Sequence, residues 1–268
     1  MADTIFKYDS ISIEYEGKVA VSNVSFSLDK GRILALVGES GSGKTTIIKS
    51  VMGILNPDAT IKNGHIVFEN ENLLEKNEKQ LRAIRGKKIG MIFQDSLGAF
   101  CPIRTIGQQI IEAVKAHYKK DKNEIKQEAL ALFDKLNLND PEKLWKSYPF
   151  ELSGGMNQRV GIAIAMLLNP TLLLADEPTS AIDENAKKMV LAELKRIRDS
   201  YGTSIIIVTH DMTVVSEIAD EVIVLKDGKV VEQGIKNQVL ENPKAEYTRQ
   251  LIEAVPTSRS EEWKLSLV

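Results

Sequence analysis

Short runs of apolar residues along the chain predict a buried parallel sheet. The clearest run is Ile33–Val37, with the sequence ILALV, and three more follow at Ile89–Phe93, Leu172–Ala175 and Ser204–Val208. Continuous apolar runs of this length are typical of strands that are buried on both faces. A helix predicted over Glu184–Tyr201 separates the last two runs. This order of strand, helix and strand favours a parallel α/β core.

Two other segments alternate between apolar and polar residues, which predicts strands with one solvated face. These segments are Ile5–Tyr15 and Asn23–Leu28, and we expect them to form an antiparallel edge region. Near the other end, Glu221–Lys226 and Lys229–Gly234 flank the dipeptide Asp227–Gly228. That dipeptide between two apolar runs is a strong signal for a hairpin turn.

Between about residues 96 and 169 the pattern changes from strands to helices. Helices are predicted over Ile106–His117, Lys122–Leu136 and Ser153–Leu168, with no convincing strand between them. We therefore expect a helical subdomain, residues 96–169, inserted into an α/β core made of residues 1–95 and 170–234. Residues 235–268 form a predicted C-terminal tail that is mostly helical around Ala245–Ala254.

The composition is that of an ordinary soluble globular protein. Of 268 residues, 43% are hydrophobic and 27% charged, and the net charge of -2 gives no electrostatic reason to expect nucleic acid. The single cysteine, Cys101, cannot form an internal disulfide, which favours a reducing compartment. The start of the chain lacks the features of a signal peptide, and the most apolar stretch, Val160–Leu168, is too short to cross a bilayer. We expect a soluble chain that reaches a membrane only through a partner.

The segment after the first apolar run carries the strongest chemical signal. Gly38–Thr45 reads GESGSGKT, which fits the pattern G-x4-G-K-[ST], and a helix is predicted from about Thr45 to Met52. Glycines let the backbone curl so that its N–H groups point at phosphate oxygens, and the helix adds its positive N-terminal end. A plain glycine-rich turn is the alternative, but the flanking strand and helix favour a phosphate-binding loop. We assign to this loop Gly38, Glu39, Ser40, Gly41, Ser42, Gly43, Lys44, Thr45 and Thr46.

Chemical roles follow for two residues of this loop and for two carboxylates elsewhere. Lys44 is expected to reach the β- and γ-phosphates, and the Thr45 hydroxyl to ligate Mg²⁺. Asp176 and Glu177 end the predicted strand Leu172–Ala175. Asp176 would be a second Mg²⁺ ligand, and Glu177 would polarise a water molecule for attack on the γ-phosphate. Alone, such a pair is more often a solvated strand end, so this interpretation depends on the phosphate loop.

A second candidate anion site lies just before a predicted helix, at Ser153, Gly154 and Gly155. Serine is a good N-cap, and the two glycines leave backbone N–H groups accessible. On its own this segment would be interpreted as a capped helix start.

The order of these motifs resembles the ATPase subunits of ABC transporters over about Ile5 to Gly234. The sequence L-S-G-G at 152–155, between the phosphate loop and the carboxylate pair, is diagnostic for that family. The resemblance implies an α/β fold: a P-loop NTPase (RecA-like) core with an antiparallel β edge region and an inserted helical subdomain. It also implies an ATP-hydrolysing motor with ATP and Mg²⁺ as cofactors. Two subunits would face head to tail, each ATP lying between one phosphate loop and the other subunit's signature, Ser153, Gly154, Gly155 and Gln158.

Four further residues match the pattern of that family. Tyr15, 23 residues before Gly38, resembles the aromatic residue that stacks on adenine, although without the family it could equally be a core residue. Gln94 resembles the glutamine that contacts Mg²⁺ and water and senses the membrane domain. Asp183 ends a segment, 180–183, that resembles the loop crossing the dimer interface, with isoleucine at 182 in place of the usual leucine. His210 resembles the histidine that contacts the γ-phosphate and would act with Lys44 and Glu177 in catalysis.

Two segments narrow the resemblance to the peptide and nickel importer group. These are Phe93–Pro102 and Tyr148–Met156, although Ser96 stands where proline is frequent in the group and Cys101 where asparagine is. Many peptide-importing members continue for roughly fifty further residues that contain a cysteine cluster, a feature this sequence does not show. The expectation is therefore metal or metal-chelate uptake ahead of di- or oligopeptide uptake, with the peptide alternative open.

The resemblance also implies partners and a location. The partners are a second ABC ATPase subunit, expected to be a different chain, two transmembrane permease subunits and an extracytoplasmic solute-binding protein. The location is the cytoplasmic face of the cell membrane, as a peripheral protein. The alternative is a soluble ABC ATPase acting on nucleic acid or ribosomes, but such chains usually fuse two cassettes or insert a long coiled coil. A catalytically inactive regulatory cassette is disfavoured, because Lys44, Asp176, Glu177 and His210 are all present.

Overall fold

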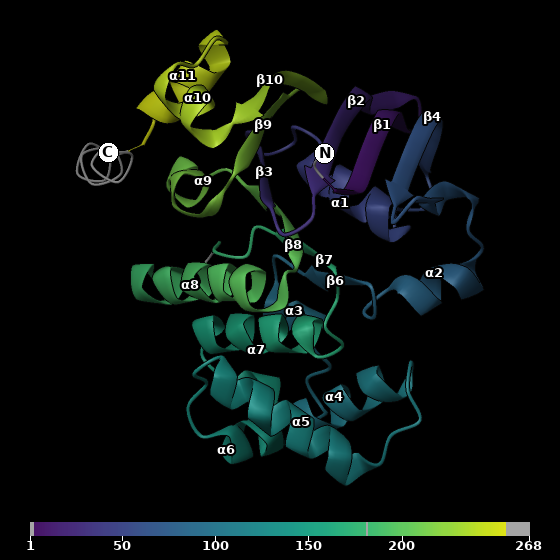
Figure 1. Cartoon of the computed structure of the whole chain (residues 1–268), viewed down its shortest axis with the longest axis vertical. Helices are drawn as coiled ribbons and strands as arrows, with labels where there is room; N and C mark the ends of the chain where they lie inside the picture. Colours follow the sequence, from purple (N-terminus) through teal and green to yellow (C-terminus); the bar gives the residue numbers. More distant parts are fainter. Residues whose placement is uncertain (1–2, 181, 256–268) are drawn as a thin grey trace.

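A six-stranded sheet forms the centre of the molecule (Figure 1), whose computed structural model describes residues 3–180 and 182–255. Five neighbouring strands of this sheet are parallel, and the sixth is antiparallel at one edge. The order is β10 (Lys229–Ile235), β9 (Glu221–Lys226), β3 (Ile33–Val37), β8 (Ser204–Thr209), β7 (Leu172–Asp176) and β6 (Ile89–Ile92). The predicted parallel α/β core is confirmed, with strand ends that differ from the predicted ones by at most one residue.

A second, antiparallel sheet lies beside the first, where the edge region was predicted. Its order is β2 (Lys18–Asp29), β1 (Thr4–Tyr15), β4 (Ala59–Phe68) and β5 (Glu71–Asn72). β2 begins five residues before the predicted start at Asn23, because Glu16 and Gly17, with φ of 47° and 80°, turn the chain directly back after β1. The strands β4 and β5 were not predicted. The hairpin turn at 227–228 is confirmed, since Asp227 and Gly228 have φ of 49° and 74°.

The two faces of the central sheet bury different elements. Leu34 and Leu36 of β3 face a cluster that includes Ile47 and Ile48 of α1 (Lys44–Met52) and apolar residues of the second sheet. The alternate residues of β3 face a cluster that holds the longest helix, α8 (Glu184–Tyr201), and the helices of residues 96–169. Helix α1 is therefore packed between the two sheets, which fixes the position of its N-terminal end and of the loop before it.

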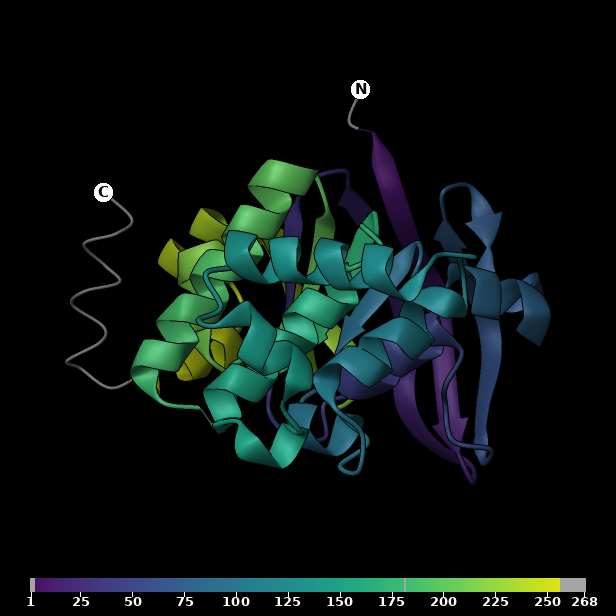
Figure 2. The same ribbon diagram turned by 90° about the horizontal axis from the view of Figure 1, so that it is seen from below.

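The segment 96–169, every residue of which the structure describes, contains helices and no strand, as predicted. The helices are α3 (Ser96–Ala99), α4 (Ile106–Lys115), α5 (Lys122–Lys135), α6 (Pro141–Lys146) and α7 (Gly154–Met166), with a 3₁₀ turn at Pro149–Glu151. The short helices α3 and α6 were not predicted. In Figure 1 this group of teal helices lies below the sheet, and in Figure 2, which is seen from below, the group lies in front of it. A buried ion pair, Arg159 Nε to Glu193 Oε1 at 2.6 Å, joins α7 to α8.

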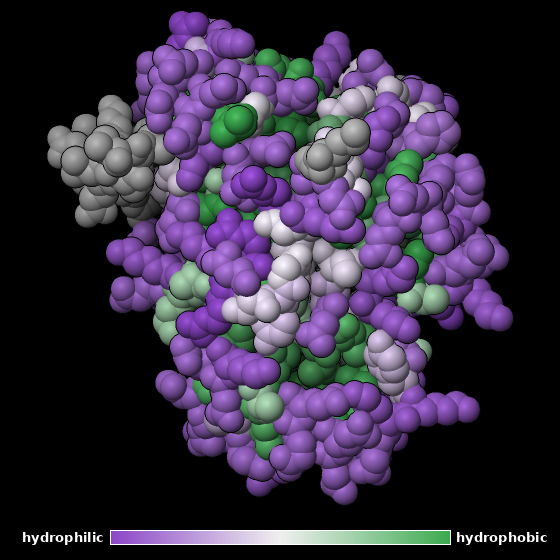
Figure 3. All heavy atoms as spheres, in the orientation of Figure 1, coloured by the Kyte–Doolittle hydropathy of each residue, from purple (hydrophilic) through white to green (hydrophobic). Residues whose placement is uncertain are grey.

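The remaining elements lie outside the helical segment. They are a 3₁₀ turn (Leu73–Glu75), α2 (Glu78–Ile84), α9 (Met212–Ile218), α10 (Lys236–Glu241) and α11 (Glu246–Glu253). One of them, α9, packs on the central strands β3 and β8. The predicted helix of the C-terminal tail is confirmed as α11, and residues 256–268 of that tail lie outside the described residues. Hydrophilic residues cover most of the face seen in Figure 3. Within 3–180 and 182–255, no helix has the length and apolar character needed to span a bilayer.

Candidate active site

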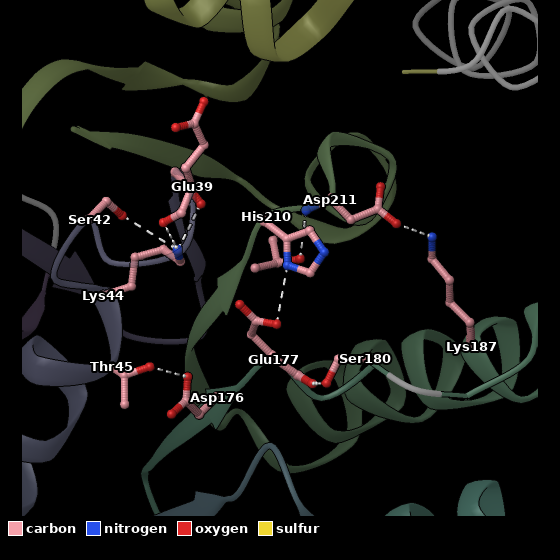
Figure 4. Close-up of polar contacts among 12 residues, drawn as sticks. Glu39, Ser42, Lys44, Thr45, Asp176, Glu177, Ser180, Lys187, His210 and Asp211 are labelled. Atoms are coloured by element: carbon pink, nitrogen blue, oxygen red, sulfur yellow. Dashed lines mark hydrogen bonds and ion pairs between the residues drawn. The ribbon is translucent and has the colours of Figure 1, made fainter. Parts of the chain in front are cut away.

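The predicted residues of the phosphate loop, the carboxylate pair and His210 meet at the carboxyl-terminal end of the central sheet. The phosphate loop follows β3, Asp176 and Glu177 end β7, and His210 follows β8. These strands are parallel neighbours, so their carboxyl ends lie at the same edge, where ligands bind in open α/β sheets. Figure 4 shows the side chains of Lys44, Thr45, Glu177 and His210 gathered there.

Glycine is required at Gly38 because the backbone of β9 passes very close to it. A Cβ atom on Gly38 would lie 2.1 Å from the carbonyl oxygen of Leu225. Gly43 combines a φ of 100° with a similar restriction, since a Cβ there would lie 2.7 Å from the carbonyl oxygen of Ala20. The φ of Gly43 fits the curled backbone that was predicted for this loop, whereas the close approach of β9 to Gly38 is a reason for glycine that the sequence did not indicate.

The Lys44 ammonium group lies inside the curled loop. Its Nζ donates to the carbonyl oxygens of Gly38 and Glu39, both at 2.7 Å, and the side chain of Ser42 lies at 3.4 Å (Figure 4). Burial lowers the pKa of Lys44, and the nearby carboxylates of Glu177 and Asp176 oppose this effect. The loop therefore concentrates a positive charge beside backbone N–H groups, an arrangement suited to phosphate.

Thr45 and Asp176 bring two oxygen atoms together at the start of α1. The Thr45 hydroxyl donates to Asp176 Oδ1 at 3.2 Å. Burial raises the pKa of Asp176, and the hydrogen bond from Thr45 opposes that rise. A divalent cation at this point would favour the charged carboxylate, and Mg²⁺ takes few protein oxygens and completes its shell with phosphate and water. These two residues therefore fit Mg²⁺.

Glu177 is held in an unusual conformation that aims its side chain at His210. Its φ is 45°, uncommon for a residue with a side chain. Hydrogen bonds fix this backbone: the Glu177 N–H donates to the Val208 carbonyl at 2.9 Å, and its own carbonyl accepts from the N–H and hydroxyl of Ser180 at 3.0 and 2.9 Å. Glu177 Oε2 then lies 3.1 Å from His210 Nδ1. Such local strain is typical of functional sites.

A cavity of about 590 Å³ connects most of the predicted residues. Of the predicted set, the residues that line it are Glu39, Ser40, Gly41, Gly43, Lys44, Thr45, Thr46, Gln94, Glu177 and His210. Tyr15 does not line this cavity; it is half-buried at the end of β1 and packs against the core around α1. The sequence did not indicate three further wall residues, Ala20, Leu251 and Ala254.

The signature residues lie apart from this cavity. Ser153 is the N-cap of α7, and its hydroxyl accepts from the Met156 N–H at 3.3 Å, as its predicted capping role requires. A Cβ on Gly155 would lie 2.8 Å from Cβ of Ala186, so glycine lets α7 start close against α8. Gln158 is buried, and its side-chain oxygen accepts a hydrogen bond from Ser96. Asp183 caps α8 by accepting from the N–H groups of Asn185 and Ala186, both at 2.9 Å.

The sequence did not indicate a buried lysine that contacts Asp211, the residue after His210. Lys187 of α8 contacts Asp211 Oδ2 and donates to the Thr213 hydroxyl at 2.8 Å (Figure 4). Asp211 is also the N-cap of α9 and accepts from the Thr213 N–H at 2.8 Å. A lysine on an amphipathic helix looks like any surface charge, so the sequence holds no signal for this contact.

The fold and the site together define a P-loop nucleotide-hydrolysing protein. The chain belongs to the ABC transporter family, whose family model matches residues 21–180. It is similar to the metal-staphylopine import system ATP-binding protein CntD of Staphylococcus aureus, at 41% identity over 92% of this chain and 90% of the relative. It is also similar to the oligopeptide transport ATP-binding protein OppD of Bacillus subtilis, at 42% identity over 92% of this chain and 69% of that relative.

A solved structure confirms the predicted fold. The dimeric ATP-binding cassette MJ0796, in a post-hydrolysis state with ADP and phosphate, superposes with a TM-score of 0.77 at 27% identity. The match covers 87% of this chain and 99% of that one. The chain is therefore an ATP-binding subunit that hydrolyses ATP to drive transport. An ATPase acting on nucleic acid or ribosomes finds no support among these relatives.

Proposed function

We propose that this chain is the ATP-hydrolysing motor of an importer for metal chelates or short peptides. The observation that carries the proposal is the meeting of Lys44, Thr45, Glu177 and His210 in one cavity, with Asp176 bonded to Thr45 beneath it. The names of the two relatives, a metal-staphylopine importer subunit and an oligopeptide transporter subunit, support the solute classes.

We assign the chemistry of hydrolysis to side chains that lie in or directly beside this cavity. Lys44 and the N–H groups of the loop bind and orient the phosphates. Thr45, Asp176 and Gln94 would hold Mg²⁺, which would supply neutralisation of the charge on the phosphate oxygens. Glu177 orients a water molecule and takes its proton, and His210, 3.1 Å from that carboxylate, keeps Glu177 in place and faces the γ-phosphate. Tyr15 would reach the base of the nucleotide from β1.

The signature residues serve the nucleotide of a second subunit. Their separation from the chain's own cavity supports this role, because Ser153 borders a different hollow, next to Leu152 and Met156. Gly154 and Gly155 would present backbone N–H groups to the partner's phosphates, Gln158 would support them from beneath, and Asp183 would lie at the interface. The dimeric state of the structural relative also supports this assembly.

We also propose a separate role for each part of the chain. Residues 1–95 and 170–234 form the nucleotide-binding core, residues 96–169 the helical signature part, and residues 235–268 the tail. The complex would contain two permease subunits, a second ATPase that is a different chain, and a solute-binding protein. This motor would sit at the cytoplasmic face of the membrane.

An apolar cavity of about 340 Å³ is the surface we assign to a permease segment. It lies between β6 and the helices α4 and α7, with Met91, Phe93, Phe100 and Ile164 in its walls. Phe93 is 43% exposed, and Leu97 of the adjoining α3 is 51% exposed, so apolar side chains also face solvent here. Gln94, which lines the nucleotide cavity, directly follows Phe93. A partner segment in the apolar cavity would thus contact Phe93, the residue directly before one that lines the nucleotide cavity.

Affinity purification of the tagged chain from membranes of its native cell tests this proposal. We expect two permeases and a second cassette to purify with it, and the variant Leu97→Asp to lose the permeases while it still binds ATP. Uptake of a labelled metal chelate and of a labelled peptide in cells that lack the gene then separates the two solute classes. The proposal would be contradicted if no membrane subunit purified with the chain and if uptake of both solutes were unaltered in the cells that lack the gene.

A further inference from the structure

A tyrosine of the C-terminal helix α11 touches the phosphate loop. The N–H of Glu39 donates to the hydroxyl oxygen of Tyr247 at 3.0 Å, across 208 positions of sequence. The Tyr247 side chain is buried, with 7% of its surface exposed. The same helix forms part of the wall of the nucleotide cavity, through Leu251 and its C-cap residue Ala254.

The peptide group that Tyr247 contacts is the one that holds the catalytic lysine. The carbonyl of Gly38 and the N–H of Glu39 belong to a single planar peptide unit. Lys44 Nζ donates to that carbonyl at 2.7 Å, while the Tyr247 hydroxyl accepts from that N–H at 3.0 Å. In a trans peptide these two groups point in opposite directions. An anchor on the N–H therefore fixes the direction in which the carbonyl faces Lys44.

Tyr247 is itself held firmly from two sides. Lys226 of β9 places its ammonium group 4.6 Å from the centre of the tyrosine ring. The start of α11 has no side-chain cap of its own, and instead Glu232 of β10 accepts from the N–H groups of Lys244 and Ala245, at 2.8 and 3.0 Å. The helix is thus tied to the hairpin β9–β10. The same hairpin provides the carbonyl of Leu225 that lies against Gly38.

We propose that Tyr247 is a positioning residue of the ATP site, through which α11 sets the affinity of the phosphate loop for nucleotide. It orients the peptide between Gly38 and Glu39, and this peptide orients Lys44. Without the hydroxyl, the Glu39 N–H loses its acceptor and the peptide can rotate, which spreads the Lys44 ammonium over several positions. The proposal rests on the phosphate-binding role assigned to Lys44.

The variant Tyr247→Phe tests this, because it keeps the ring and its contacts and removes only the hydroxyl. By calorimetry we expect its Kd for ATP to rise about fivefold, the effect of one hydrogen bond. At saturating ATP, kcat should stay within twofold of wild type, because the bound phosphates then hold the Lys44 ammonium in place, and Glu177 and His210 are untouched. Amide hydrogen exchange of Glu39 should accelerate, while exchange of the β3 amides should not.

Tyr8→Phe is the matched control. Tyr8 is fully buried, and its hydroxyl makes one hydrogen bond, to Ser50 Oγ at 3.0 Å, away from the phosphate loop. This variant should lose stability without a change in Kd for ATP. An unchanged Kd in Tyr247→Phe, or an equal rise in both variants, would overturn the positioning role. If Lys44→Ala also left the Kd unchanged, the assignment of the nucleotide site itself would fail, so the two failures are distinguishable.

Discussion

Glu177 and His210 contact each other through Oε2 and Nδ1 at 3.1 Å, although they come from different strand ends. Glu177 is 15% exposed and His210 61% exposed, so the carboxylate is sheltered and the histidine faces the cavity. The strained backbone of Glu177 and its bond to Val208 of β8 set this pairing. The two side chains can therefore act as a unit, in which one orients the other.

Glu177→Gln should separate binding from hydrolysis. The amide has the size of the carboxylate but cannot accept a proton from water, so we expect ATP to bind with near wild-type affinity. Hydrolysis should fall by at least about a hundredfold, as is typical for loss of a general base. With ATP present, the variant should accumulate a closed dimer in size-exclusion chromatography. Phosphate release within a few-fold of wild type would remove the base role of Glu177.

Lys44→Ala should lose most of its affinity for ATP. The phosphates lose their main positive contact, and the loop loses the three hydrogen bonds that Lys44 donates, two of which go to the carbonyls of Gly38 and Glu39. Calorimetry should show at least a tenfold rise in Kd. Lys30→Ala, which removes only an exposed ion pair with Asp3, is the control and should bind ATP normally. Equal affinities in the two variants would contradict the role of Lys44.

Gly155→Ala should destabilise the chain, while its neighbour Gly154→Ala should not. A Cβ at 155 meets Cβ of Ala186 at 2.8 Å, whereas a Cβ at 154 meets nothing within 4 Å. We expect Gly155→Ala to lower the free energy of unfolding by about 1–2 kcal/mol, from forced separation of α7 and α8. Gly154→Ala should change it by less than about 0.5 kcal/mol. Urea unfolding measures both free energies. Similar changes in the two variants would show that a small shift of α7 relieves the contact between residue 155 and Ala186.

Asp211→Asn should reduce the dependence of the free energy of unfolding on pH at acid pH. Burial raises the pKa of Asp211, but hydrogen bonds from Lys187 and Thr213 outweigh this and hold it below the ordinary value of 3.8. A carboxyl group whose pKa is lower in the folded state stabilises the fold above its ordinary pKa, and this contribution is lost as pH falls through the lowered value. Wild type should therefore lose more stability than the variant as pH falls below about 3.8.

At pH 7, Asp211→Asn should be less stable than wild type by about 2 kcal/mol, because the Lys187 ammonium, whose side chain is 9% exposed, loses its charged hydrogen-bond partner. Urea unfolding between pH 2 and 7 gives both results. Asp199→Asn removes an exposed partner of Arg198 and serves as the control, with little expected change. If the free energies of unfolding of wild type and Asp211→Asn changed equally with pH, the pKa of Asp211 would not differ between the folded and unfolded states.

The sequence predicts most of the core because burial leaves a strong pattern. Strand β3 was predicted residue for residue, since all five of its side chains are buried. Strand β4 was missed because only Ile66 and Phe68 are buried in its ten residues, and its register shifts against β1 near Asn63. Its Gly64 also packs against the backbone of β1, where a Cβ would lie 2.3 Å from the Asp9 carbonyl oxygen.

The site divides in the same way between local and long-range features. The phosphate loop and the pair Asp176–Glu177 are contiguous motifs, so their spacing predicts their chemistry. The contacts of Lys187 with Asp211 and of Tyr247 with Glu39 join residues that are 24 and 208 positions apart. Nothing in either local sequence distinguishes these residues from an ordinary surface lysine or a core tyrosine. Such contacts follow only from the packing of α8 and α11 on the core.

The way the helical segment joins the sheet has a mechanical consequence. The chain leaves β6 just before Gln94 and returns to β7 just after Asn169, and β6 and β7 are hydrogen-bonded neighbours. The helical segment is therefore attached to the sheet at the ends of two adjacent strands, and the buried Arg159–Glu193 ion pair attaches it to α8 as well. Because Gln94 lies at the first of these strand ends and also lines the nucleotide cavity, a displacement of the segment at this connection would change the wall of the cavity directly.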